Sequence, residues 1–153
     1  MEVVIREARP EDFEAVFILL GQLRYQFKEK KPADKAGVLA IYERYLESDD
    51  HAVYVAEAEG RPVAAMSISV LQSLYDHCPY VVVDELVVDG GHRGHGTGKR
   101  LLDEAFRLAR ERGCCEVCLD TTTDNEGAIR FYRAYGFDQE SILFEKELHG
   151  EAG

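Results

Sequence analysis

Residues 80–112 place an apolar run, a glycine-dense loop and an amphipathic helix in direct succession, and this order constrains the fold more than any other feature of the sequence. The run Tyr80–Val88 is rich in β-branched residues, which predicts a largely buried strand. Five glycines and an arginine lie within residues 89–98. The helix that follows has a broad apolar face, and Gly113 stands where a left-handed C-terminal cap is expected.

The strand, the loop and the helix N-terminus together predict an anion-binding site. Glycines let backbone N–H groups turn toward one point, and the first helical turn adds unpaired donors and a positive dipole end. A Walker A loop is excluded, because it would require glycine at Arg93 and a hydroxyl at Arg100. The dinucleotide pattern is excluded as well, because it would require glycine at Lys99 or Leu101. The expected ligand group is a phosphate or pyrophosphate held by another kind of loop.

The loop resembles the Arg-x-x-Gly-x-Gly signature of the GCN5-related N-acetyltransferases, here from Arg93 to Gly98. The resemblance implies that the loop holds the pyrophosphate of acetyl-coenzyme A. A simple glycine-rich turn is the alternative interpretation of the loop alone. The residues implied in cofactor binding at the loop are Arg93, Gly94, His95, Gly96, Thr97, Gly98 and Lys99.

A second motif strengthens the resemblance. Residues 125–132 and 135–137 look like the family's Asn-x-x-Ala-x-x-Phe-Tyr…Gly-Phe motif. The implied fold is a single α/β (α+β) domain over residues 1–153, with a mixed, mostly antiparallel sheet flanked by helices and a frayed tail from about residue 149. The expected order is β-α-α-β-β-β-α-β-α-β. Its strands are expected at 3–8, 51–58, 63–70, 80–88, 114–120, 137 and 142–148. Helices are expected to start at Pro10, Pro32 and Lys99, and a short helix is expected from Glu126 to Tyr135, where Gly136 ends it.

Charge narrows the classes of partner. The net charge of −11 argues against a nucleic acid partner, and no apolar run approaches the roughly 20 residues that span a bilayer. Residues 92–112 hold six Lys/Arg against three Asp/Glu, so this segment carries +3 while the remainder carries −14. One polyphosphate cofactor and a cationic substrate elsewhere would suit this distribution. We expect a cytoplasmic protein, and a homodimer is compatible with the sequence.

Four cysteines, Cys78, Cys114, Cys115 and Cys118, are interpreted as small core hydrophobes. The Cys115-x-x-Cys118 spacing is not read as zinc or redox chemistry, because residues three apart on a strand point to opposite faces and a second ligand pair is missing. No metal site is expected.

Acetyl transfer to an amine requires a base for the ammonium proton, donors for the oxyanion and an acid for the departing thiolate. Glu85 is the first candidate for the base, because it occupies the family's usual acidic position. Asp84 is the second candidate, but on a regular strand it would face the other way, so only one of the two is expected to reach the site. The resemblance makes Tyr132 the general acid and Asn125 an anchor for the cofactor arm, to which Leu86, Val87 and Val88 would offer backbone groups. The two acids and Tyr132 also have purely structural interpretations. The acids could be a solvated strand end, and Tyr132 could be a packed core residue.

The acceptor is the least defined part. An acidic mouth with aromatic walls is expected to attract a small cationic primary amine, a polyamine or an aminoglycoside-like compound. Its predicted residues are Tyr25, Phe27, Glu29, Tyr75 and Asp76. Three alternatives stay open. They are an aminoalkylphosphonate acceptor, a peptidyl amine, and a non-catalytic acyl-CoA-binding module on the same fold.

Overall fold

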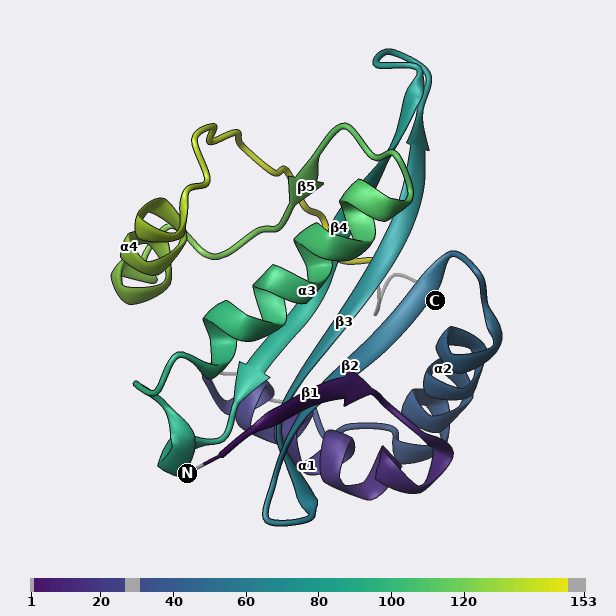
Figure 1. The fold of residues 1–153 in the computed structure, drawn as a ribbon, viewed down its shortest axis with the longest axis vertical. Coiled ribbons are helices and arrows are strands. Elements are labelled where there is room, and N and C mark those ends of the chain that lie inside the picture. The colour runs from purple at the N-terminus through teal and green to yellow at the C-terminus, as the bar shows by residue number, and fades with distance from the viewer. Residues whose placement is uncertain (1, 27–30, 149–153) are drawn as a thin grey trace. The chain divides into compact units, whose positions relative to one another are not determined.

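The computed structural model describes residues 2–26 and 31–148 (Figure 1). The chain forms two compact units that divide between Leu119 and Asp120. In the first unit the elements follow in the order β1 (Val4–Glu7), a 3₁₀ turn (Pro10–Asp12), α1 (Phe13–Gln26), α2 (Lys35–Glu47), β2 (His51–Ala58), β3 (Arg61–Ser73), β4 (Cys78–Val88), a second 3₁₀ turn (Gly90–His92), α3 (Thr97–Glu111) and β5 (Val117–Cys118).

The five strands form one sheet in the order β1-β2-β3-β4-β5. The first three pairings are antiparallel and β4–β5 is parallel, so the predicted mixed, mostly antiparallel sheet is confirmed. The long β3–β4 hairpin extends further than predicted, because residues 71–73 and 78–79 continue the ladder instead of forming a loop.

Alternation along the strands gives the sheet two apolar faces. Val53, Val55, Ala65 and Val87 face α1 and α2, where they join one core cluster with Phe13, Val16, Leu19 and Tyr42. Helix α3 covers the opposite face (Figure 1). Its residues Leu101, Leu102 and Ala105 are completely buried, in agreement with the apolar face expected from the sequence.

Local signals explain where the helices begin. Asp12 accepts hydrogen bonds from Arg6 at 2.7 Å and from the backbone of Arg9 at 2.7 Å, which ties β1 to the start of α1. Helix α2 begins at Lys35 rather than at Pro32, because the Asp34 side chain caps it by accepting from the backbone N–H of Gly37.

The second unit contains α4 (Glu126–Tyr135), as predicted. Asn125 caps its N-terminus and Gly136, at φ 125°, ends it. The structure differs from the predicted order after this helix: residues 137–148 contain no strand. Apolar content alone does not make a strand, which needs a partner for its backbone groups, and Ile142 and Phe144 are largely exposed here.

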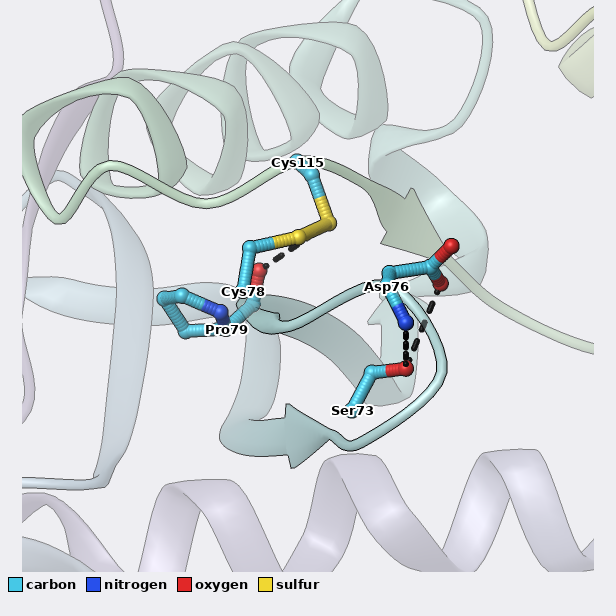
Figure 2. Close-up of a disulfide and its surroundings, with 5 residues drawn as sticks. All are labelled: Ser73, Asp76, Cys78, Pro79 and Cys115. Atoms are coloured by element: carbon cyan, nitrogen blue, oxygen red, sulfur yellow. Dashed lines mark hydrogen bonds between the residues drawn. A yellow bond between two sulfur atoms is a disulfide. The ribbon is translucent and has the colours of Figure 1, made fainter.

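The interpretation of the cysteines as core residues is wrong. Cys78 and Cys115 form a disulfide that joins the start of β4 to the segment before β5 (Figure 2). Cys115 is exposed, while Cys114 and Cys118 are partly exposed and form no disulfide. The expected strand 114–120 shortens to Val117–Cys118, because only Val81 and Val82 of β4 pair with it. None of the described helices is long and apolar enough to cross a membrane.

Candidate active site

A β-bulge in β4 brings two adjacent carboxylates to one face of the sheet. Ser67 pairs with Glu85, but the next residue of β3, Ile68, pairs with Val83, so Asp84 is an extra residue in β4. Ser67 and Ser69 share one face of β3, since they are two residues apart. Ser67 bonds Glu85 and Ser69 bonds Asp84, so both carboxylates lie on that face. The expectation that Asp84 faces away is therefore wrong, because it assumed a regular strand.

The two carboxylates have different surroundings. Asp84 accepts hydrogen bonds from Ser69 Oγ at 2.6 Å and from Tyr45 Oη, on α2, at 3.1 Å. Glu85 accepts one from Ser67 Oγ and retains exposed surface. The protein atoms around the Glu85 carboxyl displace much of its water, and this desolvation, together with the neighbouring charge of Asp84, raises its pKa although the Ser67 bond opposes the shift. Glu85 is thus the carboxylate better suited to accept a proton.

A pocket of about 360 Å³ opens beside Glu85, between α1, α2 and the sheet. We call it the α1–α2 pocket. Most of its wall is apolar, and Tyr45, Ser67 and Glu85 supply polar atoms at the sheet. The remaining lining residues are Val16, Leu20, Leu23, Arg24, Val38, Ile41, Tyr42, Val53, Ala65, Met66 and Val87. Its size and composition are those of a small-molecule site.

The glycine loop has the backbone expected of an anion site. Gly94 and Gly96 adopt positive φ angles of 83° and 80°, a region that favours glycine, and Thr97 begins α3 directly afterwards. The first N–H groups of a 15-residue helix therefore follow the loop. Arg93 Nε donates to the carbonyl of Val88 at 3.0 Å, which holds the loop against the end of β4. Thr97 is buried, whereas His95, Gly98 and Lys99 lie at the surface or partly so.

Asp89 and Gln22 organise the entry to this loop, and sequence reasoning missed both. Gln22 donates to Asp89 at 2.7 Å and accepts from the backbone N–H of Gly90 at 3.1 Å, which links α1 to the loop. The hydrogen bonds from Gln22 and His92 lower the pKa of Asp89 to about 2. The sequence did predict a turn at this point, since an aspartate before two glycines favours one. Nothing in the sequence identified Gln22 on α1 as the partner of Asp89.

One edge of β4 is left open beside the loop. The β4–β5 ladder covers only Val81 and Val82, so in the described chain no strand pairs with residues 83–88 on that edge. The predicted contact residues Leu86, Val87 and Val88 lie in this open stretch. The Val88 carbonyl already accepts from Arg93 Nε. A strand edge that no other strand covers can also bind an extended amide-containing molecule through its backbone groups.

The second unit carries the other two predicted site residues. The Asn125 side chain accepts from the backbone N–H of Ala128 at 3.1 Å, so it caps α4. Tyr132 packs between Phe131 and Phe137, with ring centroids 5.4 and 5.7 Å away. Burial, with a smaller contribution from the charge of Asp120, raises the pKa of the Tyr132 phenol, so it keeps its proton at neutral pH.

The predicted acceptor residues are not assembled as expected. Tyr25 lines a second hollow with Gly90 and Arg93, next to the glycine loop rather than in the α1–α2 pocket. Tyr75 and Asp76 lie at the turn of the β3–β4 hairpin, about 20 Å along the strands from the Ser67–Glu85 pair. Phe27 and Glu29 lie outside the described residues. Within the described chain, no cluster of three or more His, Cys, Asp or Glu side chains is placed to hold a metal ion.

The comparisons with known proteins agree with this geometry. The sequence profile of the acetyltransferase (GNAT) family matches residues 5–137. An uncharacterised N-acetyltransferase of Methanocaldococcus jannaschii is 28% identical over 121 residues, which are 78% of this chain and 51% of the relative. The glucosamine 6-phosphate N-acetyltransferase 1 of Oryza sativa subsp. japonica is 36% identical over 96 residues, 61% of this chain and 56% of the relative.

The chain thus spans about half the length of these two curated relatives. Among solved structures, an aminoglycoside N-acetyltransferase in complex with CoA superimposes with a TM-score of 0.82 at 25% identity, over 95% of each chain.

Proposed function

Since this chain belongs to the acetyltransferase (GNAT) family, we propose that it transfers the acetyl group of acetyl-CoA to the primary amine of a small cationic molecule. The amine attacks the thioester directly, without an acetyl-enzyme intermediate. The observation that carries the proposal is the position of Glu85. It borders the α1–α2 pocket on the same strand that leads into the glycine loop, so an acceptor bound in the pocket and a pyrophosphate bound at the loop would both lie along β4.

The cofactor's pyrophosphate would bind the backbone N–H groups of residues 93–99, with the first turn of α3 adding its dipole. The amide-containing arm would lie along the open edge of β4 beside Leu86, Val87 and Val88. The complex of a relative with CoA supports this choice of co-substrate. When bound, acetyl-CoA supplies the activated acyl group. The residues of this chain orient that group, accept the proton of the amine and donate a proton to the thiolate.

Glu85 acts as the general base in this proposal. A primary amine is mostly protonated at neutral pH, because its pKa is near 10.4 in the case of lysine, and it must lose a proton before attack. The raised pKa of Glu85 makes its carboxylate a better acceptor for that proton. Tyr132 is proposed as the acid that protonates the departing thiolate, and its protonated phenol supports that role.

The test is single-turnover acetyl transfer, with enzyme in excess over acetyl-CoA, to a panel of alkylamines, polyamines, aminoglycosides, aminoalkylphosphonates and peptides. Formation of an N-acetylated product, slowed by roughly a hundredfold or more in Glu85→Gln, would support the proposal. Tight acetyl-CoA binding with no product for any amine would leave the non-catalytic module as the function.

A further inference from the structure

The polar atoms of the α1–α2 pocket are largely used by other parts of the protein. Tyr42 Oη donates to the carbonyl of Arg9 at 2.6 Å, so this residue offers the pocket its ring. Tyr45 Oη donates to Asp84 at 3.1 Å, and Ser67 Oγ donates to Glu85. Each of these hydroxyls has its one proton engaged, so it can offer an ammonium only the lone pairs of a neutral oxygen, which bind a cation more weakly than a carboxylate does. Glu85 is therefore the main anchor for an incoming amine.

The rest of the pocket wall offers no comparable anchor. Helix α1 contributes Val16, Leu20 and Leu23, helix α2 contributes Val38 and Ile41, and the sheet contributes Val53, Ala65 and Val87. A hydroxyl or second ammonium pressed against these side chains would lose water without gaining a hydrogen bond, which is unfavourable. The wall therefore discriminates against acceptors with many polar groups.

The charged side chains of the lining also disfavour an acceptor with a second ammonium. Besides Glu85, the lining contains one permanently charged side chain, the guanidinium of Arg24 on α1, among the described residues. One carboxylate can neutralise one ammonium. A second ammonium in the same pocket would meet apolar side chains and a like charge, in contrast to the acidic mouth expected from the sequence.

We propose that the acceptor is a primary monoamine with an uncharged apolar body, an alkyl or arylalkyl amine whose ammonium lies at Glu85. This inference rests on the proposed function and narrows its acceptor class. It excludes polyamines and aminoglycosides as preferred substrates, although a relative of known structure is named for the latter. The specificity comes from desolvation of the acceptor's far end rather than from the net charge of the protein.

Three amines of matched length test the proposal on the full-length protein: hexylamine, hexamethylenediamine and ε-aminocaproate. They share the reacting amine and differ at the far end, which is a methyl group, an ammonium or a carboxylate. We expect kcat/KM with acetyl-CoA to be higher for hexylamine by about tenfold or more over the diamine, because the second ammonium is desolvated in the pocket and meets the like charge of Arg24. The amino acid tests the opposite sign of charge, since Arg24 is the cationic group among the described lining residues that could pair with its carboxylate. A preference for the diamine or for the amino acid, at equal concentration and low salt, would overturn the proposal.

A variant at the pocket wall provides the reciprocal test. Ile41 lines the pocket and is 53% exposed, so Ile41→Glu adds a carboxylate with little risk to folding. The variant should lower the ratio of kcat/KM for hexylamine to kcat/KM for hexamethylenediamine by about tenfold, because the second ammonium gains a counter-charge. Leu39→Glu is the matched control, since Leu39 lies on the same helix, is 37% exposed and is not part of the pocket lining. Equal ratios in the two variants would also overturn the proposal.

Failure of the underlying activity gives a different result. If none of the amines is acetylated, the proposed function is wrong, and the pocket is then tested by binding alone. Isothermal calorimetry should still show tighter binding of hexylamine than of the diamine in the wild type, with Ile41→Glu removing most of that difference. Absence of this difference would refute the apolar acceptor independently of catalysis.

Discussion

Asp84 and Glu85 are adjacent in the sequence, yet their carboxylates lie on the same face of the sheet, because the bulge in β4 makes Asp84 an extra residue between two regular pairs. The arrangement gives Glu85 one neighbour that donates a hydrogen bond, Ser67, and another that adds negative charge, Asp84. The two neighbours therefore shift the pKa of Glu85 in opposite directions.

Substitutions of these two neighbours should move the pH profile of kcat/KM in opposite directions. The Ser67 bond favours the charged carboxylate, so Ser67→Ala should raise the pKa of Glu85 and shift the acidic limb to higher pH. The charge of Asp84 disfavours it, so Asp84→Asn should shift that limb to lower pH. The amine titrates in the same way in all variants, so it does not affect the differences between their profiles. The contribution of Glu85 to the limb should be lost in Glu85→Gln, and shifts of the same sign in both variants would show that another group is titrating.

The glycine loop predicts a graded loss of cofactor binding. Gly96 has a φ of 80°, and a Cβ added there would meet no atom within 4 Å. Gly96→Ala should thus cost only about 1–2 kcal/mol of backbone strain and weaken acetyl-CoA binding modestly. Gly96→Glu adds a negative charge at the pyrophosphate site and should abolish binding, while Arg93→Ala should only weaken it. Calorimetric Kd values check this order, and an unchanged Kd for Gly96→Glu would remove the loop from the cofactor site.

Tyr132→Phe separates an acid from a packing residue. The ring keeps its contacts with Phe131 and Phe137, so Tm and the Kd for acetyl-CoA should change little. Loss of the hydroxyl should lower kcat by roughly ten- to a thousandfold if it protonates the thiolate. A kcat equal to the wild type, measured where chemistry limits turnover, would assign Tyr132 to packing alone.

The disulfide predicts a redox-dependent stability. The bond closes a loop with a sequence separation of 37, for which the chain-entropy relation gives about 4 kcal/mol of stabilisation. Cys78→Ser/Cys115→Ser should lower the free energy of unfolding by about that amount in non-reducing buffer. The matched control is Cys114→Ser/Cys118→Ser, which replaces the two cysteines that form no disulfide. Denaturant unfolding measures both, and the gap should close in excess dithiothreitol. Equal stability of the two variants without reductant would contradict a stabilising disulfide.

Features that are determined by residues close together in the sequence were predictable. The loop from Arg93 to Gly98 and helix α3 were identified from glycine spacing and a 3.6-residue apolar period, both of which act within a few residues. Helix α4 was likewise predicted with its observed bounds, Glu126–Tyr135, because its cap at Asn125 and its terminating Gly136 are local signals.

Features that depend on distant partners were not predictable. The bulge at Asp84 is set by the register between β3 and β4, and two adjacent acids between apolar residues do not show that one residue of the run Val81–Val88 is extra. The cysteine spacing did not indicate that Cys78, 37 residues away, is the partner of Cys115. The network that joins Gln22 to Asp89 crosses 67 residues of sequence and carries no motif.

The acceptor site shows the same limit. Net charge suggested an acidic, aromatic mouth, but charge counts do not say which helix faces lie over β4. The structure places α1 and α2 there with apolar side chains, and it leaves Tyr75 and Asp76 at the far end of the hairpin. The described elements therefore give the pocket an apolar character that composition did not predict.

Direct transfer to a bound amine is tested most directly by a rapid-quench single turnover of acetyl-CoA with hexylamine. N-acetylhexylamine and free CoA should appear at the same rate, and intact-protein mass spectrometry should detect no acetylated protein at any time. Appearance of acetyl-protein before product, or persistence of bound acetyl-CoA with no N-acetylhexylamine, would contradict direct transfer.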